Sequence, residues 1–270
     1  MSESRRQRVL ITGASSGIGE CTAQTLSARG HHVFGTSRAP RSGSQNGFQW
    51  LKMDICQDDS VEESICELVN QVGGIDAVVC NAGMSIFGAV EDVAIEDAKK
   101  QFETNFFGTL RVLRNVLPLM REAKSGRVLL VGSLAGRAPI PFQAHYSATK
   151  AAIDALSASL ANEMAAYGVR VVLIEPGDIR TPFNDSMAWE TSPSTSPYAS
   201  ALARVEKVIR DSLTVAPPPQ KVADKIIRAI ESRRPRARYT AGAEAGLVPF
   251  AKRLLPDRIN LALIRRHFDL

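Results

Sequence analysis

Residues 8–19 read RVLITGASSGIG, an apolar run followed at once by a glycine-rich turn and the start of a helical pattern. The run from Arg8 to Ile11 is typical of a buried strand, and a helix is expected from about Gly17 to Arg29. Gly13 and Gly17 would let the backbone approach a pyrophosphate, and the free N–H groups at the helix start favour an anion. The spacing is not that of the GxGxxG fingerprint, and glycine-rich turns also occur without a ligand. The stretch predicts a strand–turn–helix unit and makes a dinucleotide its best candidate ligand.

Strand and helix patterns alternate along the rest of the chain. Further strands are expected at about residues 33–36, 49–53, 76–80, 127–132, 169–174 and 238–241. Further helices are expected at about 58–72, at 95–121 with a stop near Pro118, at 145–167, from about 199, and at 219–232. Such alternation predicts an α/β fold with a doubly wound, parallel, seven-stranded sheet (a Rossmann fold) and helices on both faces. We expect residues 1–270 to form a single domain.

Four polar or turn-forming features fall directly after predicted strands. They are the turn at Gly13, the run Asn81-Ala82-Gly83, Ser133, and the run Pro176-Gly177-Asp178-Ile179-Arg180-Thr181. Ligands of such sheets bind outside the carboxyl ends of the strands, so these features should meet at one edge.

A tyrosine and a lysine lie four positions apart in this part of the chain. If a helix begins near Tyr146, then Tyr146 and Lys150 share one face. A lysine ammonium beside a phenol favours the phenolate, so the pKa of Tyr146 should fall below about 10. Ser133, on another element, could hydrogen-bond the same oxygen. The spacing alone favours an ordinary surface pair, but the position of Ser133 at the ligand edge favours an acid–base site.

Arg38 follows the second predicted strand, 19 positions beyond Gly19. An acid at this place would bind the ribose hydroxyls of NAD, whereas a guanidinium suits the 2′-phosphate of NADP. The surrounding GTSRAPRSGSQNG contains no acid, so NADP is favoured over NAD, and a merely solvated arginine is the alternative. Asp54, after the third strand, either binds the adenine or caps the next helix.

Asn105 is a polar residue among Phe102, Phe106 and Phe107 in the long helix over 95–121. Helix interiors disfavour asparagine, so it either faces solvent or has a specific role. The apolar residues of this helix and of the one over 146–167 could build the core or pair two subunits.

Residues 183–214 interrupt the alternation with a Ser-, Thr- and Pro-rich stretch, and we expect a mobile lid over the substrate here. Phe142, Phe183, Met187 and Trp189 are candidates for an apolar substrate pocket. The extension over 242–270 is amphipathic and basic. It could rest on a membrane surface, although covering the core or pairing with another subunit is favoured.

Composition narrows the class of protein. The chain has 44% hydrophobic residues and four cysteines without paired metal-ligand spacing, which favours reduced thiols in a cytoplasmic protein. No signal peptide or membrane span is evident in the sequence. From Arg204 onward there are 15 Lys and Arg against 7 Asp and Glu, without interleaved aromatics. A solvated basic face is favoured over nucleic-acid binding.

Taken together, these motifs resemble the classical short-chain dehydrogenases/reductases. The matching residues are Thr12-Gly13-xxx-Gly17-Ile18-Gly19, Asn81-Ala82-Gly83, Asn105, Ser133, Tyr146-xxx-Lys150 and Pro176-Gly177. Cys80 departs from the family, which usually has an asparagine there. The turn at Arg38 and the C-terminal tail are loosely similar to NADP-linked steroid- and retinoid-type members.

The resemblance implies hydride transfer between NADP(H) and a carbonyl or secondary alcohol, without a metal. Tyr146 would be the general acid–base, Lys150 would hold the nicotinamide ribose and lower the pKa of Tyr146, and Ser133 would bind the substrate oxygen. Asn105 would hold a water that links Lys150 to solvent. The implied cofactor contacts are Gly13, Ser15, Ser16, Gly17, Ile18, Gly19, Arg38, Asp54, Ile55, Asn81, Ala82, Gly83, Tyr146, Lys150, Pro176, Gly177, Ile179 and Thr181.

The family usually forms homodimers or homotetramers through helices equivalent to 95–121 and 146–167. A redox sensor that binds NADP without turnover is the alternative, and a nicotinamide-using isomerase or dehydratase is a third. The complete Ser, Tyr, Lys and Asn set argues against a sensor, which needs no acid–base pair.

Overall fold

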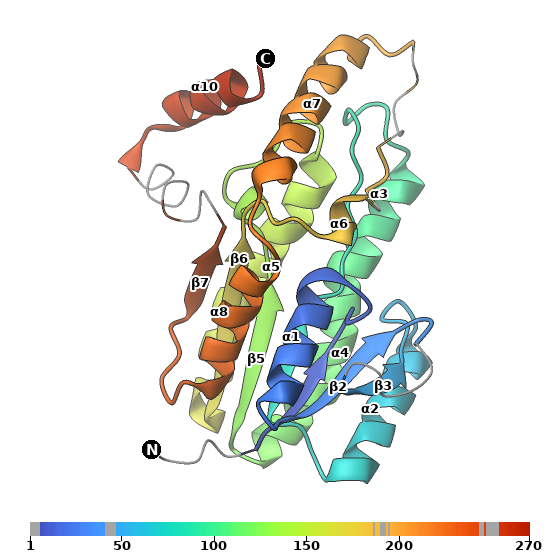
Figure 1. The fold of residues 1–270 in the computed structure, drawn as a ribbon, viewed down its shortest axis with the longest axis vertical. Helices are drawn as coiled ribbons and strands as arrows, with labels where there is room; N and C mark the ends of the chain where they lie inside the picture. Colours follow the sequence, from blue (N-terminus) through green and yellow to red (C-terminus); the bar gives the residue numbers. More distant parts are fainter. Residues whose placement is uncertain are drawn as a thin grey trace.

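The computed structural model describes residues 6–40, 47–185, 187–189, 193, 195–242, 246 and 254–270. Seven parallel strands form one sheet in the order β3-β2-β1-β4-β5-β6-β7 (Figure 1). The strands are β1 (Arg8–Ile11), β2 (His32–Ser37), β3 (Gln49–Lys52), β4 (Ala77–Cys80), β5 (Gly126–Val131), β6 (Val169–Pro176) and β7 (Arg238–Ala241). The strand order reverses between β1 and β4, which is the switch point where such folds bind ligands. The predicted doubly wound, seven-stranded sheet is confirmed.

Helices cover both faces of the sheet. One face packs against α2 (Asp58–Val72), α4 (Gly108–Glu122) and α5 (Ala144–Glu163), and the other against α1 (Gly17–Ala28) and α8 (Gln220–Glu231) (Figure 1). The central strand β4 supplies both cores, because its residues alternate between the faces. Val78 and Cys80 join the first core, whereas Ala77 and Val79 join the second. The thiol of Cys80 is only 5% exposed, so the departure from the family is accommodated as core packing.

The long helix predicted over 95–121 is three segments. They are α3 (Ile95–Phe102), the π-helical segment η1 (Glu103–Phe107) and α4 (Gly108–Glu122). The predicted stop near Pro118 is wrong, because Pro118 lies inside α4 and the helix continues to Glu122. The wider π-helical turn changes which side chains face the interior, and Asn105 within it is buried, with 2% of its surface exposed.

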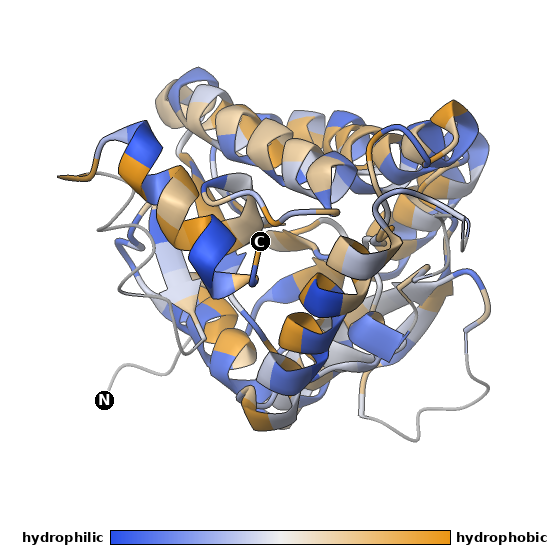
Figure 2. Ribbon diagram, turned by 90° about the horizontal axis from the view of Figure 1, so that it is seen from above, coloured by the Kyte–Doolittle hydropathy of each residue, from blue (hydrophilic) through white to orange (hydrophobic). Residues whose placement is uncertain are grey.

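A third apolar cluster lies beyond the carboxyl ends of the strands. The short helix α6 (Pro182–Asp185), the helix α7 (Ala199–Val215) and the C-terminal helix α10 (Asp257–His267) surround this end of the sheet (Figure 1). The buried part of the cluster is formed by Phe87, Met187, Leu202, Val205, Ile209 and Phe268. In the view from above, the helix that ends at the C-terminus carries both hydrophobic and hydrophilic residues (Figure 2).

Parts of the predicted lid and of the C-terminal extension lie outside the described residues, namely 186, 190–192, 194, 243–245 and 247–253. Within the described chain, no helix is both long and apolar enough to cross a membrane.

Candidate active site

The glycine turn after β1 is locked to the turn after β4. The Thr12 hydroxyl accepts hydrogen bonds from the N–H groups of Asn81 (3.0 Å) and Ala82 (3.1 Å). In return, the Asn81 amide donates to the carbonyls of Thr12 (3.0 Å) and Gly13 (3.1 Å). Gly13 has φ +66°, and a Cβ there would lie 2.8 Å from the Cα of Ala82. These contacts bring the two sequence motifs together as predicted, and they require glycine at position 13.

The start of α1 is open toward the same edge. Its N-cap residue, Ser16, makes no side-chain capping hydrogen bond, so no cap from that side chain competes with an anion for the first-turn N–H groups. A Cβ on Gly19 would lie 2.6 Å from the Asn81 amide nitrogen and would collide with the Gly13 carbonyl. The residues present therefore fit a dinucleotide phosphate. The glycines have no side chain that would keep the phosphate away from the backbone, and the first-turn N–H groups of α1 can donate hydrogen bonds to it.

Arg38 lies just beyond the end of β2, on the wall of the same cavity. Asp54 lines this wall too, and its carboxylate accepts a hydrogen bond from the N–H of Cys56 at 3.0 Å. The N-cap position of α2 belongs to Gln57, so Asp54 forms the preceding turn instead of capping that helix. Ile55 lies beside it on the cavity wall.

Ser133, Tyr146 and Lys150 meet at the end of β5. Ser133 follows the strand and its hydroxyl accepts a hydrogen bond from the N–H of Ala135 at 3.1 Å. Tyr146 is in the first turn of α5, and the Lys150 nitrogen lies 5.6 Å from the centre of its ring. Lys150 donates a hydrogen bond to the carbonyl of Val131 at 2.9 Å. All three side chains line one cavity, so the predicted acid–base constellation is spatially assembled.

The protonation of this group differs from the prediction. Burial raises the pKa of Tyr146 to about 12, although the nearby Ser133 hydroxyl acts in the opposite direction. Burial lowers the pKa of Lys150 to about 8. The prediction of a lowered tyrosine pKa was wrong, because it counted the lysine charge and left out desolvation, which disfavours both charged forms. At neutral pH the structure therefore holds a neutral phenol beside an ammonium.

Asn105 has a specific role and does not face solvent. Its side-chain oxygen accepts from the N–H of Met84 (2.8 Å), while its NH₂ donates to the Met84 carbonyl (2.9 Å) and to the hydroxyl of Thr149 (3.0 Å). Asn105 itself does not line the cavity. It ties the segment after β4 to the residue that precedes Lys150 on α5.

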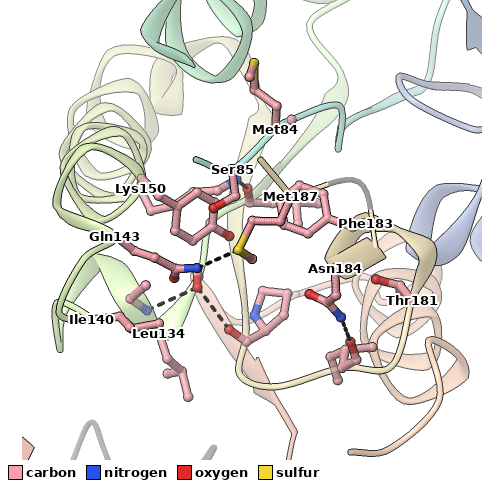
Figure 3. Close-up of a pocket in the computed structure, with 18 of the residues that line it drawn as sticks. Met84, Ser85, Leu134, Ile140, Gln143, Lys150, Thr181, Phe183, Asn184 and Met187 are labelled. Atoms are coloured by element: carbon pink, nitrogen blue, oxygen red, sulfur yellow. Dashed lines mark hydrogen bonds between the residues drawn. The ribbon is translucent and has the colours of Figure 1, made fainter. Parts of the chain in front are cut away.

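The loop after β6 closes the opposite side of the site. Pro176, Gly177, Ile179 and Thr181 all line the cavity. The N–H of Gly177 donates to the carbonyl of Ala241 at 2.8 Å, and the Asn184 amide donates to the carbonyl of Ile179 at 2.8 Å (Figure 3). The side chain of Thr181 would lie 3.2 Å from a Cβ at Gly17, so this loop reaches across to the glycine turn.

The cavity has a volume of about 1310 Å³ and runs from the glycine turn to α7 and α10. Of the residues predicted to bind the cofactor, all but Gly19 line it. Two predicted substrate residues, Phe183 and Met187, also line it, and the Phe183 ring lies 6.2 Å from that of Tyr146. Phe142 and Trp189 do not line it; each packs against Phe87, at centroid distances of 6.1 and 5.2 Å.

Several lining residues were not found from the sequence. Arg137 is held by Glu175, whose carboxylate is 2.8 Å from the Arg137 Nε. The C-terminal helix contributes Asn260, Leu261 and Ile264, together with Phe268 just beyond it. Ser85 and Gln143 are both 3% exposed and line the substrate end. No local pattern marks these residues, since tertiary packing alone brings them here.

Comparison with known proteins agrees with this geometry. Residues 7–191 match the model of the short chain dehydrogenase family. The chain belongs to that family. Its relatives include a 3-ketodihydrosphingosine reductase of Bacteroides thetaiotaomicron, 36% identical over 96% of this chain and 97% of the relative. An NADPH-dependent 3-dehydrocapnine reductase of Ornithobacterium rhinotracheale is 31% identical over 93% of each chain.

A solved short-chain dehydrogenase from Streptomyces avermitilis superimposes with a TM-score of 0.81 and 27% identity. The match covers 96% of this chain and 95% of that one. The structural similarity therefore extends well beyond the 7–191 segment that the family model matches.

Proposed function

We propose that this short-chain dehydrogenase is an NADP(H)-dependent carbonyl reductase, with Tyr146 as general acid–base and an apolar small molecule as substrate. The observation that carries the proposal is the single cavity that holds both the glycine turn with Arg38 and the group Ser133, Tyr146 and Lys150. Bound nicotinamide would supply the hydride. The acid–base set and the cofactor residues thus face each other across one continuous space.

Each side chain has a role that its environment supports. Tyr146, with its pKa at about 12, is protonated at neutral pH and can donate its proton to a carbonyl oxygen. Ser133 hydrogen-bonds the same oxygen and stabilises the charge that develops on it. Lys150 is an ammonium below about pH 8, so it stabilises the phenolate left after the proton has moved. Asn105 holds the segment before Lys150 in place through Thr149.

NADP is supported over NAD by three observations. Arg38 lies where the adenosine ribose is bound in this type of fold, and its planar guanidinium can pair with a 2′-phosphate. The sequence over residues 35–47 contains no acid that would repel this phosphate. The Ornithobacterium relative is named as NADPH-dependent.

The walls of the substrate end favour a long or bulky apolar molecule. Leu134, Ile140, Phe183 and Met187 line it near Tyr146. Farther out, the lining continues over α7 and α10 with Val208, Ile209, Leu213, Leu261, Leu263 and Ile264. The named relatives are both reductases, which supports reduction of a carbonyl as the direction of the reaction. The segment over 183–214 would act as the lid.

A homodimer or homotetramer through α3–α4 and α5 is part of the proposal, and the half-exposed Phe107 (46%) supports such a contact. The cytoplasmic location and the single domain over residues 1–270 stay predictions. The four cysteines are unpaired, which fits a reducing compartment.

The function is tested by following NADPH oxidation with a panel of aliphatic and cyclic ketones. Tyr146→Phe removes only the phenolic hydroxyl and should lower kcat by a factor on the order of 10² to 10⁴. Tyr167→Phe is the matched control, since Tyr167 is 41% exposed and is not among the residues that line the cavity. Equal rates for wild type and Tyr146→Phe would overturn the assignment, and NADPH binding without turnover of any ketone would favour the sensor alternative.

A further inference from the structure

Ser85 is a buried hydroxyl without a partner. The residue is 3% exposed, and among the described residues its Oγ makes no hydrogen bond. It nevertheless lines the substrate end of the cavity. Burying a hydroxyl without a hydrogen bond costs free energy. An unpaired hydroxyl in the wall of a cavity therefore indicates that a bound ligand supplies the missing hydrogen bond.

Gln143 lines the same end, and within the described part of the chain its side chain has a weak partner. Its NH₂ donates to the thioether sulfur of Met187 at 3.1 Å, and the residue is 3% exposed (Figure 3). Thioether sulfur is a poor acceptor compared with oxygen or nitrogen. A polar group of a ligand in the cavity would therefore be a stronger hydrogen-bond partner for the Gln143 amide than the sulfur of Met187 is.

Both side chains lie in segments that hydrogen bonds or helix structure attach to neighbouring elements. Asn105 fixes the backbone of Met84, the residue before Ser85, with bonds of 2.8 and 2.9 Å. The Ser85 carbonyl accepts from the N–H of Ala188 at 3.2 Å, so the lid segment is attached here as well. Gln143 is the N-cap residue of α5 and precedes Tyr146 by three positions.

The two side chains also converge. In the close-up, Ser85, Gln143 and Met187 point into the same part of the cavity, with Phe183 beside them (Figure 3). Around this pair the wall is mainly apolar, with Leu134, Ile140 and Phe183, while Ser133 and Tyr146 supply the reacting polar groups. A buried polar pair within an apolar wall specifies one position along a ligand and fixes its orientation.

We propose that Ser85 and Gln143 bind a hydroxyl or amino group carried by the substrate next to its carbonyl carbon. The inference rests on the proposed function and narrows its substrate class to α-hydroxy or α-amino ketones with an apolar chain. The Gln143 oxygen and the Ser85 oxygen accept from such a group, and the Ser85 hydroxyl can donate to it. A ketone without this group leaves both side chains unpaired and binds less well.

The test compares decan-2-one, 1-hydroxydecan-2-one and 1-aminodecan-2-one. Their binding is measured by calorimetry on the protein saturated with NADP⁺, which cannot reduce them, and their reduction is measured with NADPH. Wild type should bind at least one substituted ketone about threefold to tenfold more tightly than decan-2-one, which is the range of one or two hydrogen bonds. Whichever of 1-hydroxydecan-2-one and 1-aminodecan-2-one binds more tightly shows whether the site prefers a hydroxyl or an amino group.

Ser85→Ala should reduce this preference by about threefold to tenfold. It should not lower the unfolding midpoint, because the hydroxyl has no partner to lose. Ser212→Ala is the matched control, since this serine lines the same cavity but already donates to the Asp178 carboxylate at 2.8 Å. Gln143→Met supplies a second variant and should also reduce the preference.

An equal preference in wild type and Ser85→Ala overturns the inference, as does a wild type that binds neither substituted ketone. These outcomes are separable from a failure of the proposed function. If no ketone is reduced with NADPH, the proposed reaction is wrong, while the binding ratios still decide the role of Ser85. If all three ketones are reduced but the ratios do not change, only the inference fails.

Discussion

The amide of Asn105 and the hydroxyl of Thr149 are joined by a 3.0 Å hydrogen bond between the π-helical segment η1 and helix α5. Because Thr149 precedes Lys150 and Asn105 also holds Met84, this bond connects the lysine to the segment that carries Ser85. Asn105→Ala removes three hydrogen bonds and leaves the N–H of Met84 without its acceptor, so it should lower the free energy of unfolding by about 2–4 kcal/mol. Chemical denaturation followed by circular dichroism measures this loss.

Asn115→Ala is the matched control for that change. Asn115 lies in α4 and makes one hydrogen bond, to the Arg111 carbonyl at 3.0 Å. Its replacement should cost no more than about 1 kcal/mol. Equal losses at the two positions would contradict the role of Asn105 as a connection between elements.

Arg38→Asp should change cofactor preference. It removes the guanidinium that suits a 2′-phosphate and places there a carboxylate that suits ribose hydroxyls. The ratio of kcat/KM for NADPH to that for NADH should fall by about tenfold to a hundredfold, since charge-assisted bonds contribute about 1.5–3 kcal/mol. The exposed Arg170, on β6, gives the control Arg170→Asp. An unchanged ratio in Arg38→Asp would show that another residue recognises the ribose.

Lys150 should make stability rise with pH. Its pKa in the folded protein is about 8, below its ordinary value of 10.5, so between these values the unfolded chain binds more protons than the folded one. The free energy of unfolding therefore increases from about pH 8 to 10.5, by up to about 3 kcal/mol from this group. Below pH 8 that contribution is absent. Denaturation curves of wild type and Lys150→Met at pH 7 to 10 measure it, and parallel pH profiles would rule it out.

Gly19→Ala should abolish cofactor binding at micromolar concentrations. The new methyl group would collide with the Gly13 carbonyl and lie 2.6 Å from the Asn81 amide, which displaces the turn that must cradle the phosphates. Gly30→Ala is a useful control, because Gly30 has φ +85° but no atom within 4 Å of an added Cβ. It should cost about 1–2 kcal/mol of stability from backbone strain and leave the Kd for NADPH unaltered. The quenching of tryptophan fluorescence on adding NADPH reports both affinities.

The fold was largely predictable because its signals are local. The helix over 58–72 and the strand over 238–241 were predicted with the bounds that the structure shows, since each has regular apolar spacing and clear boundaries. Gly13, Asn81 and Ser133 follow strands and Pro176 is the last residue of one, so topology alone brings them to one edge. The π-helical turn at Asn105 has no residue pattern of its own and was missed.

The details of the candidate site were less predictable because they depend on tertiary packing. The sign of the shift in the Tyr146 pKa follows from burial, which the spacing of Tyr146 and Lys150 does not reveal. Ser85 and Gln143 are ordinary polar residues in the sequence, and only the folded chain shows one without a partner and the other against a sulfur atom. The same holds for the part of the wall that α10 supplies.

Cys80 gives this chain an internal reporter at the centre of its sheet. The thiol lies in β4, between β1 and β5, and burial raises its pKa to about 12. It cannot react with an alkylating reagent until the core between the sheet and α2, α4 and α5 opens, whereas the exposed Cys66 reacts from the native state. The alkylation rate of Cys80, followed by mass spectrometry, therefore measures how often this core opens under native conditions.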